Sequence, residues 1–160
     1  MLPTLLLGYG NPDRQDDGVA WHILANVARQ LGVAPLPPPG EDFPPGGGQP
    51  DLLFALQLTP EMAETIAGYA RVCFVDAHTG AIPSELQMIP LKGEFQRSPF
   101  THHLTAESCL ALCQNLYHKH PEAILVSVQG YQFGFAQSLS ERTQELAAQA
   151  AQSILQWLAS

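Results

Sequence analysis

Apolar positions along the chain fall into short uninterrupted runs that are separated by longer segments of helical periodicity. Short apolar runs bounded by turn residues are typical of strands inside a parallel sheet, and recurrence at i, i+3 and i+4 is typical of amphipathic helices. Interior strands are predicted at residues 5–7, 51–57, 71–76 and 124–128. Residues 85–91 alternate enough to predict an edge strand, which fits an antiparallel direction.

Four helices are predicted between and after these strands. The apolar stripe of the first comprises Val19, Ala20, Ile23, Leu24, Val27, Ala28 and Leu31. We expect Gly32 to end it, Thr59 and Pro60 to start a helix of about nine residues, and Thr105 and Ser140 to cap the last two. The stripe of the third comprises Cys109, Leu110, Leu112, Cys113 and Leu116. The chain therefore predicts an α/β three-layer sandwich, a mostly parallel sheet of about five strands with helices on both faces.

Residues 35–50 interrupt this alternation. The segment holds seven of the 14 prolines and four of the 13 glycines. Proline supplies no backbone N–H and glycine loses the most entropy on ordering, so the segment predicts an exposed, mobile loop rather than a regular element. It would act as a spacer or as a polyproline docking segment. Because no second core precedes it, residues 1–160 are expected to form a single domain.

Composition narrows the classes of partner. The chain carries 7 Lys and Arg against 15 Asp and Glu, a net charge of −8. Nucleic acid and anionic membranes attract clustered cations, so neither is expected as a partner. The N-terminus lacks a basic start, and no stretch approaches the roughly 20 apolar residues of a spanning helix. We expect a cytoplasmic monomer in which Cys73, Cys109 and Cys113 are buried thiols without a disulfide.

The first strand ends in a polar loop that carries the strongest candidate chemistry. Gly8-x-Gly10-Asn11 is followed by the paired carboxylates of Asp16 and Asp17 at the start of a helix. Such a pair can cap the helix or hold a cation, and we expect Asp16 to cap while Asp17 is functional. A dinucleotide site is disfavoured, because the third glycine of that fingerprint and the acidic residue after a second strand are missing.

Two further groups with metal-ligand chemistry follow later strands. Asp76 ends the predicted strand at residues 71–76, and His102 and His103 precede the third helix. In open α/β sheets, ligands bind outside the carboxyl ends of the strands, where Asp17 and Asp76 can meet. Two carboxylates and an imidazole suit a borderline divalent ion such as Ni, Zn or Co. Singly, each residue could instead be a cap, a turn residue or a solvated loop residue.

Together these motifs resemble the endopeptidases that mature [NiFe] hydrogenases. The resemblance lies in Gly8-x-Gly10-Asn11 with Asp16-Asp17-Gly18, in Val75-Asp76-Ala77, and in Thr101-His102-x-Leu104-Thr105. It implies an α/β protease that removes the C-terminal extension of a hydrogenase large-subunit precursor after nickel has been inserted. The family's metal-contacting positions fall on Asp17, Asp76 and His102. The nickel is carried by the precursor, so no tightly bound cofactor of the protease itself is implied.

The chain departs from many members of this family after the second strand. It has Gln57-Leu58-Thr59-Pro60-Glu61 where they carry a segment like Asp-Gly-Gly-Thr, and the segment before it is unusually rich in proline. Both features resemble the subgroup that serves bidirectional, NAD-coupled hydrogenases. Two other functions stay open: a peptidyl-tRNA hydrolase, which the opening motif also resembles but whose basic face is missing, and a non-catalytic nickel-sensing chaperone or binding module.

The sequence favours hydrolysis by water over a covalent intermediate. Cys73 lies inside a predicted strand and Cys109 and Cys113 inside a predicted helix, and no Ser-His-Asp or Cys-His arrangement stands in motif context. The substrate's nickel would polarise the water, and Asp17 or Asp76 would position it or take its proton. Asp17 and Asp76 are therefore the predicted catalytic residues.

Overall fold

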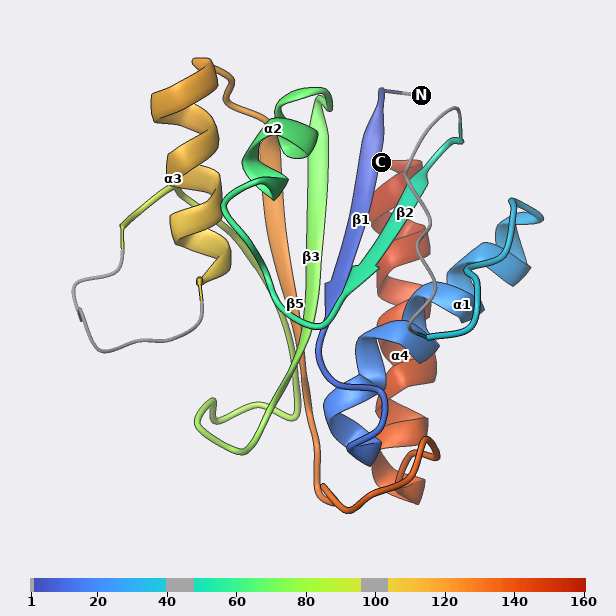
Figure 1. Ribbon diagram of the computed structural model, residues 1–160. Coiled ribbons are helices and arrows are strands. Elements are labelled where there is room, and N and C mark those ends of the chain that lie inside the picture. The colour runs from blue at the N-terminus through green and yellow to red at the C-terminus, as the bar shows by residue number, and fades with distance from the viewer. Residues whose placement is uncertain (1, 40–47, 96–103) are drawn as a thin grey trace.

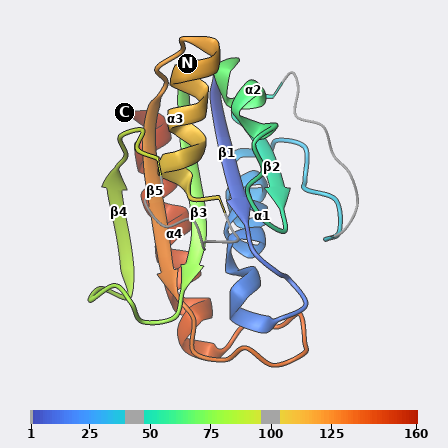
Figure 2. The same cartoon turned by 60° about the vertical axis from the view of Figure 1, so that its left-hand side comes forward.

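The computed structural model describes residues 2–39, 48–95 and 104–160. Its centre is a five-stranded sheet with the strand order β2-β1-β3-β5-β4. The strands are β1 (Thr4–Tyr9), β2 (Asp51–Ala55), β3 (Arg71–His78), β4 (Leu86–Pro90) and β5 (Glu122–Gln129). All neighbouring pairs are parallel except β4 and β5, which are antiparallel. Figure 2 shows β2 and β4 at the two edges, which confirms the predicted antiparallel edge strand at β4. The prediction of an interior strand over residues 51–57 was wrong in two respects, because β2 is the other edge strand and ends at Ala55.

Helices cover both faces of this sheet and complete a three-layer α/β sandwich, as predicted. The helices are α1 (Val19–Leu31), α2 (Met62–Ala67), α3 (Ala106–Tyr117) and α4 (Glu141–Ala159), with a 3₁₀ turn η1 (Gln15–Gly18) before α1. Helices α1 and α4 lie side by side on one face, and α2 and α3 lie on the other (Figure 1). Because strand side chains alternate between faces, each face needs its own apolar set.

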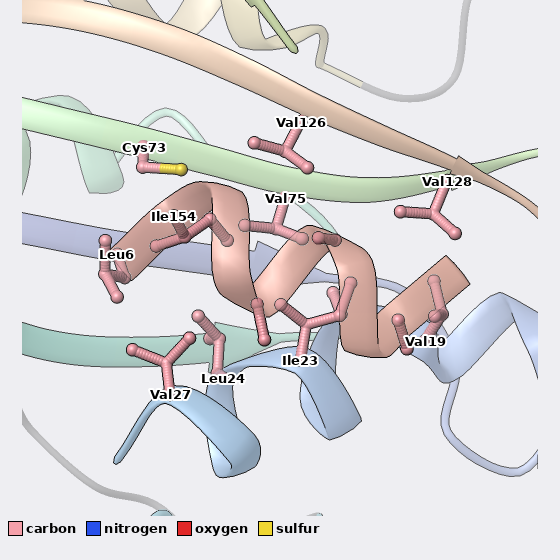
Figure 3. Packing of buried hydrophobic residues seen from close by; sticks show 14 of the residues in the cluster. Leu6, Val19, Ile23, Leu24, Val27, Cys73, Val75, Val126, Val128 and Ile154 are labelled. Carbon is pink, nitrogen blue, oxygen red and sulfur yellow. The ribbon is translucent and has the colours of Figure 1, made fainter. Parts of the chain in front are cut away.

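Two apolar clusters fill these layers. The first packs α1 and α4 against the sheet and includes the fully buried Leu6, Ile23, Leu24, Val75 and Ile154 (Figure 3). The second packs α2 and α3 against the other face and includes Leu5, Leu7, Ile66, Phe74 and Leu110. Odd positions of β1 and even positions of β3 belong to the second cluster. Tyr9 and Asp76, which continue these two series, therefore project from the same face of the sheet.

Most predicted helix ends are confirmed. Gly32 ends α1 in the left-handed conformation with a φ of 69°, and Thr105 caps α3 by accepting a hydrogen bond from the Ser108 N–H at 3.1 Å. The prediction for α2 was too long, because residues 59–61 form a turn and the helix has only 6 residues. Ser140 is the N-cap residue of α4, but its side chain makes no capping hydrogen bond.

Four apolar residues differ from their predicted environment, among them Leu56, which lies beyond the end of β2 within the predicted strand and is 67% exposed. Leu31 and Leu116 lie in the last turns of α1 and α3 and are 38% and 61% exposed, although they belong to the predicted apolar stripes. Leu36 lies in the proline-rich segment that was predicted to be exposed, yet it packs into the first cluster. The Trp21 indole N–H fixes this part of the chain by donating to the Pro37 carbonyl at 3.2 Å. Residues 40–47 lie outside the described part of the chain.

The three cysteines are buried and free, as the sequence predicted. In the described part of the chain, no helix is both long and apolar enough to cross a membrane.

Candidate active site

A cleft of about 210 Å³ opens at the carboxyl ends of three neighbouring strands. It is lined by Tyr9, Gly10, Asp17, Leu56, Gln57, Leu58, Asp76, Ala77 and Leu104. From β1 the chain passes to β2 on one side of the sheet and later to β3 on the other, so β1 and β3 flank a topological switch point. Such points form ligand crevices in open α/β sheets. Asp17 follows β1 and Asp76 lies in β3, and the fold brings both predicted carboxylates into this one cleft.

The loop after β1 holds Asp17 at the cleft. Its Oδ2 accepts a hydrogen bond from the Asn11 N–H at 2.8 Å, which ties the side chain back to the glycine-containing loop. Gly10 has a φ of 144°, and a Cβ atom there would lie 2.1 Å from the Asp17 carbonyl oxygen. Only glycine accepts both this conformation and this close approach. The Gly-x-Gly-Asn motif is therefore what places the Asp17 carboxylate.

We predict that Gly10→Ala lowers the free energy of unfolding by at least ~1–3 kcal/mol, because backbone strain is added to a clash with the Asp17 carbonyl. Gly68→Ala is the matched control, since Gly68 has a φ of −81° and its nearest contact would be the Thr65 carbonyl oxygen at 3.4 Å. Urea unfolding of both variants measures the difference. Equal losses in the two variants would contradict the proposed role of the motif.

The Asp76 carboxylate is held by one oxygen only. Its Oδ2 accepts a hydrogen bond from the Tyr9 hydroxyl at 3.0 Å, whereas its Oδ1 is buried without a hydrogen-bond partner among the described residues. Burial raises the pKa of Asp76 to about 6, and the negative charges of Glu107 and Asp17 act in the same direction. Hydrogen bonds from Tyr9 and Ser127 oppose this shift. A carboxyl group with a pKa near neutrality in a cleft is typical of a general base.

Asp16 does not cap the first helix, so this prediction was wrong. Neither η1 nor α1 has a side-chain cap, and the Asp16 side chain is instead fully buried among groups from the other end of the chain. Its Oδ1 accepts from the Ser140 N–H at 2.7 Å. Its Oδ2 accepts from the Tyr131 N–H at 2.8 Å, the Gln132 N–H at 2.9 Å and the Ser140 hydroxyl at 2.6 Å. The Ser140 hydroxyl is thus directed at Asp16 and makes no capping hydrogen bond to α4.

The hydrogen bonds to Asp16 favour its charged form. Burial alone would raise the pKa of Asp16, but the hydrogen bonds from Ser140, Tyr131 and Gln132 outweigh burial and hold the pKa below its ordinary value. The paired carboxylates thus divide into a structural one and one that faces the cleft. The structural half of the expected division is present, although this role joins distant segments rather than capping a local helix, and the function of Asp17 stays a prediction.

Residues 130–139, here called the rim loop, wrap around the loop that carries Asp17. Arg14 donates to the Phe133 carbonyl from Nε at 3.0 Å and Nη2 at 2.5 Å, and its guanidinium lies 4.6 Å from the centre of the Phe135 ring. The Gln15 N–H donates to the Ala136 carbonyl at 2.8 Å. Figure 1 shows the rim loop beside the start of α1 at the carboxyl ends of the strands. These contacts tie the rim loop to the loop that carries Asp17.

The comparisons with known proteins agree with this architecture at the level of structure alone. No protein-family model matches the chain, and no curated protein matches its sequence. Solved structures do match over almost the whole chain. The maturation protease HycI from Thermococcus kodakarensis KOD1 has a TM-score of 0.65 and 19% identity, covering 99% of this chain and 94% of its own. HybD from Escherichia coli, a hydrogenase maturating endopeptidase, has a TM-score of 0.69 and 15% identity, covering 99% and 93%. The chain has the fold of [NiFe] hydrogenase maturation proteases.

A third structure extends the likeness to another lineage. The hydrogenase 2 maturation peptidase from Thaumarchaeota archaeon SCGC_AB-539-E09 has a TM-score of 0.61 and 19% identity, covering 98% of this chain and 97% of its own. At such low identities the likeness establishes the maturation-protease fold, and the residues of this chain must carry the argument about function.

The third predicted ligand lies outside the described residues. His102 and His103 both fall in residues 96–103, but Leu104, two positions after His102, lines the same cleft as Asp17 and Asp76. Within residues 2–39, 48–95 and 104–160, no group of three His, Cys, Asp or Glu side chains is placed to hold a metal ion. The maturation-protease fold thus presents two of the three predicted ligands together.

The cysteine thiols are poorly suited to nucleophilic chemistry. Burial raises the pKa of Cys73 far above its ordinary value and raises the pKa of Cys109 to about 12, and burial also raises the pKa of Cys113. Thiolate is the nucleophilic form, so all three would be protonated at neutral pH. None of them lines the cleft within the described residues.

Tyr9 is the residue that sequence analysis missed. It occupies the variable position between Gly8 and Gly10, where the motif gives no chemical reason to expect a polar contact. The sequence does place Tyr9 at the end of an interior strand, directly before the loop that carries Asp17. This position could have marked it as a residue of the site. Its partner Asp76 lies 67 residues away in the sequence, so only the strand pairing reveals the contact.

Proposed function

We propose that this protein is an endopeptidase that removes the C-terminal extension of a [NiFe] hydrogenase large-subunit precursor after nickel insertion. The observation that carries the proposal is the meeting of Asp17 and Asp76 in one cleft at the carboxyl ends of β1 and β3. A maturation-protease fold with this pair in this place supports an acidic site for a metal-bearing substrate. The protein would act as a monomer on the precursor in the cytoplasm.

The proposed metal-contacting side chains would allow the protease to recognise nickel. Carboxylate oxygens from Asp17 and Asp76 with an imidazole from His102 would suit a borderline divalent ion while leaving positions for the precursor's own ligands. The ion is cargo of the substrate, so the protease needs only a partial set of ligands. The segment Gln57–Glu61 and the proline-rich stretch support the bidirectional, NAD-coupled hydrogenases as the substrate subgroup.

Water is the proposed nucleophile. The described residues that line the cleft include no serine, threonine or cysteine, whereas both carboxylates are present. Asp76, whose pKa is about 6, can accept a proton from water at neutral pH, and Asp17 can orient the same water. Nickel held by the precursor would lower the pKa of that water and polarise the scissile carbonyl.

A cleavage assay tests this function. Metal-free protease is mixed with nickel-loaded or nickel-free large-subunit precursor, and the mass of the large subunit is measured over time. We expect loss of the C-terminal extension from the nickel-loaded precursor only. Equal cleavage of both forms would remove nickel from the mechanism, and cleavage of neither would contradict the proposed activity.

Two controls separate the alternatives. Alkylation of the protease thiols should leave cleavage unchanged, because the cysteines are buried and protonated. Release of peptide from peptidyl-tRNA should not occur, since the chain has a net charge of −8 and only 7 Lys and Arg to contact tRNA phosphates. Stable binding of nickel-loaded precursor without any mass change would favour a nickel-sensing chaperone.

A further inference from the structure

Tyr9 and Asp76 stand next to each other on paired strands. Gly8 of β1 pairs with Val75 of β3 in parallel register, so the next residue on each strand is again a neighbour. Both side chains project from the face that carries the second apolar cluster, and Tyr9 packs against that cluster. The tyrosine ring is therefore fixed by the core, and its hydroxyl reaches Asp76 Oδ2 at 3.0 Å.

The hydroxyl acts as a donor in this pair. An ionised carboxylate oxygen can only accept a hydrogen bond, so the Tyr9 hydroxyl must be the donor to Asp76 Oδ2. A phenol has a single hydrogen to donate, and here it goes to the carboxylate. Tyr9 also lines the cleft, which places the pair at the site rather than behind it.

The hydrogen bond from Tyr9 leaves the two carboxylate oxygens of Asp76 unequal, although Ser127 on β5 also contributes a hydrogen bond to this carboxylate. Oδ2 is engaged by Tyr9, while Oδ1 is buried without a hydrogen-bond partner within the described residues. A buried carboxylate oxygen without a partner costs free energy, and such a cost is expected where a ligand supplies the missing contact. Groups that hydrogen-bond a ligating carboxylate commonly fix its orientation.

We infer that Tyr9 is a positioning residue that holds Asp76 by Oδ2 and leaves Oδ1 for the substrate's metal or the attacking water. This inference rests on the proposed function, because it assigns Tyr9 a role through Asp76 in that reaction. Tyr9 neither supplies nor removes a proton in the reaction. Its contribution is to keep one oxygen of the carboxylate in a fixed direction.

The chain offers a matched control for this role. Tyr69 also donates its hydroxyl to a carboxylate oxygen, Asp51 Oδ2, at 2.5 Å. Asp51 begins β2 and Tyr69 lies two residues before the start of β3, so this second pair lies at the amino ends of the strands, opposite the cleft. Tyr9→Phe and Tyr69→Phe each remove one oxygen atom and one hydrogen bond of the same kind.

The experiment measures kcat and KM for nickel-loaded precursor, and the stability to urea, for wild type and both variants. We expect Tyr9→Phe to lower kcat by about 10- to 100-fold with KM little changed, and Tyr69→Phe to leave both unchanged. The free energy of unfolding should change by a similar amount in the two variants. A loss of kcat in Tyr9→Phe alone would then reflect the positioning of Asp76 and not a loss of stability.

Each outcome decides the inference. An unchanged kcat in Tyr9→Phe, or equal losses of kcat in both variants, would overturn the positioning role while leaving the proposed function intact. Failure of wild type to cleave would overturn the proposed function and this inference with it.

Discussion

Asp76→Asn should lower kcat for precursor cleavage by about 10²- to 10⁴-fold, the range expected for loss of a general base. Asparagine keeps the size of the side chain and can still accept the Tyr9 hydrogen bond, but it carries neither the negative charge nor the proton affinity of the carboxylate. The measurement is single-turnover cleavage of nickel-loaded precursor, with the mass of the large subunit as the readout. A rate within a few-fold of wild type would contradict a catalytic role for Asp76.

A nearby carboxylate provides the control. Asp13 lies in the same loop as Asp17, is exposed, and accepts a hydrogen bond from the Gln137 side chain at 2.9 Å. Asp13→Asn removes one negative charge from this end of the molecule without touching the cleft. We expect it to cleave at the wild-type rate, so that a loss in Asp76→Asn reports the position of the carboxylate rather than net charge.

The stability of Asp76→Asn should move in the opposite direction from its activity. The folded state raises the pKa of Asp76 to about 6, so the charged carboxylate opposes folding above this pH and the penalty disappears as pH falls below the unfolded pKa. Asparagine avoids the penalty, and at pH 7 the variant should be as stable as wild type or more stable by ~1–3 kcal/mol. An inactive but stable protein is therefore the expected result.

The sequence predicted the parts of this molecule that local pattern determines. Leu5, Leu6 and Leu7 form an uninterrupted apolar run because helices cover both faces of the sheet. Leu6 packs into the first cluster on one face, and Leu5 and Leu7 pack into the second cluster on the other. The carboxyl ends of parallel strands share one edge, and this rule alone was enough to bring Asp17 and Asp76 into the same cleft. Their roles in the reaction remain proposals.

What the sequence could not predict depends on partners far along the chain. Asp16 precedes a helix, and local pattern makes a cap the simplest interpretation, but its partners lie 115 to 127 residues away in the rim loop and α4. Tyr9 likewise has a distant partner, Asp76 on β3, which lies 67 residues away in the sequence. In both cases the hydrogen-bond partner of the side chain is set by the packing of distant segments, which local sequence pattern does not describe.

Removing the Asp16 carboxylate should destabilise the protein far more than loss of a helix cap, which typically costs ~1 kcal/mol. Asp16→Ala leaves the backbone N–H groups of Tyr131, Gln132 and Ser140 without their acceptor, the first two in a part-buried place and that of Ser140 in a buried one. The Thr143 hydroxyl, 3.0 Å from Oδ2, loses a neighbour as well. We expect the free energy of unfolding to fall by about 3–5 kcal/mol, the range for breaking a buried charged network.

The pH dependence of this loss identifies its cause. The folded state lowers the pKa of Asp16, so its contribution to stability is complete above the unfolded pKa and is lost as pH falls through the folded pKa. Urea unfolding of wild type and Asp16→Ala should therefore differ most near pH 7 and converge in acid, with Asp13→Ala as the exposed control. A difference that stays constant at all pH values would contradict a stabilising role of the ionised Asp16 carboxylate. The rim loop braces the loop that holds Asp17. The fraction of the Asp16→Ala protein that remains folded should therefore also cleave the precursor more slowly than wild type.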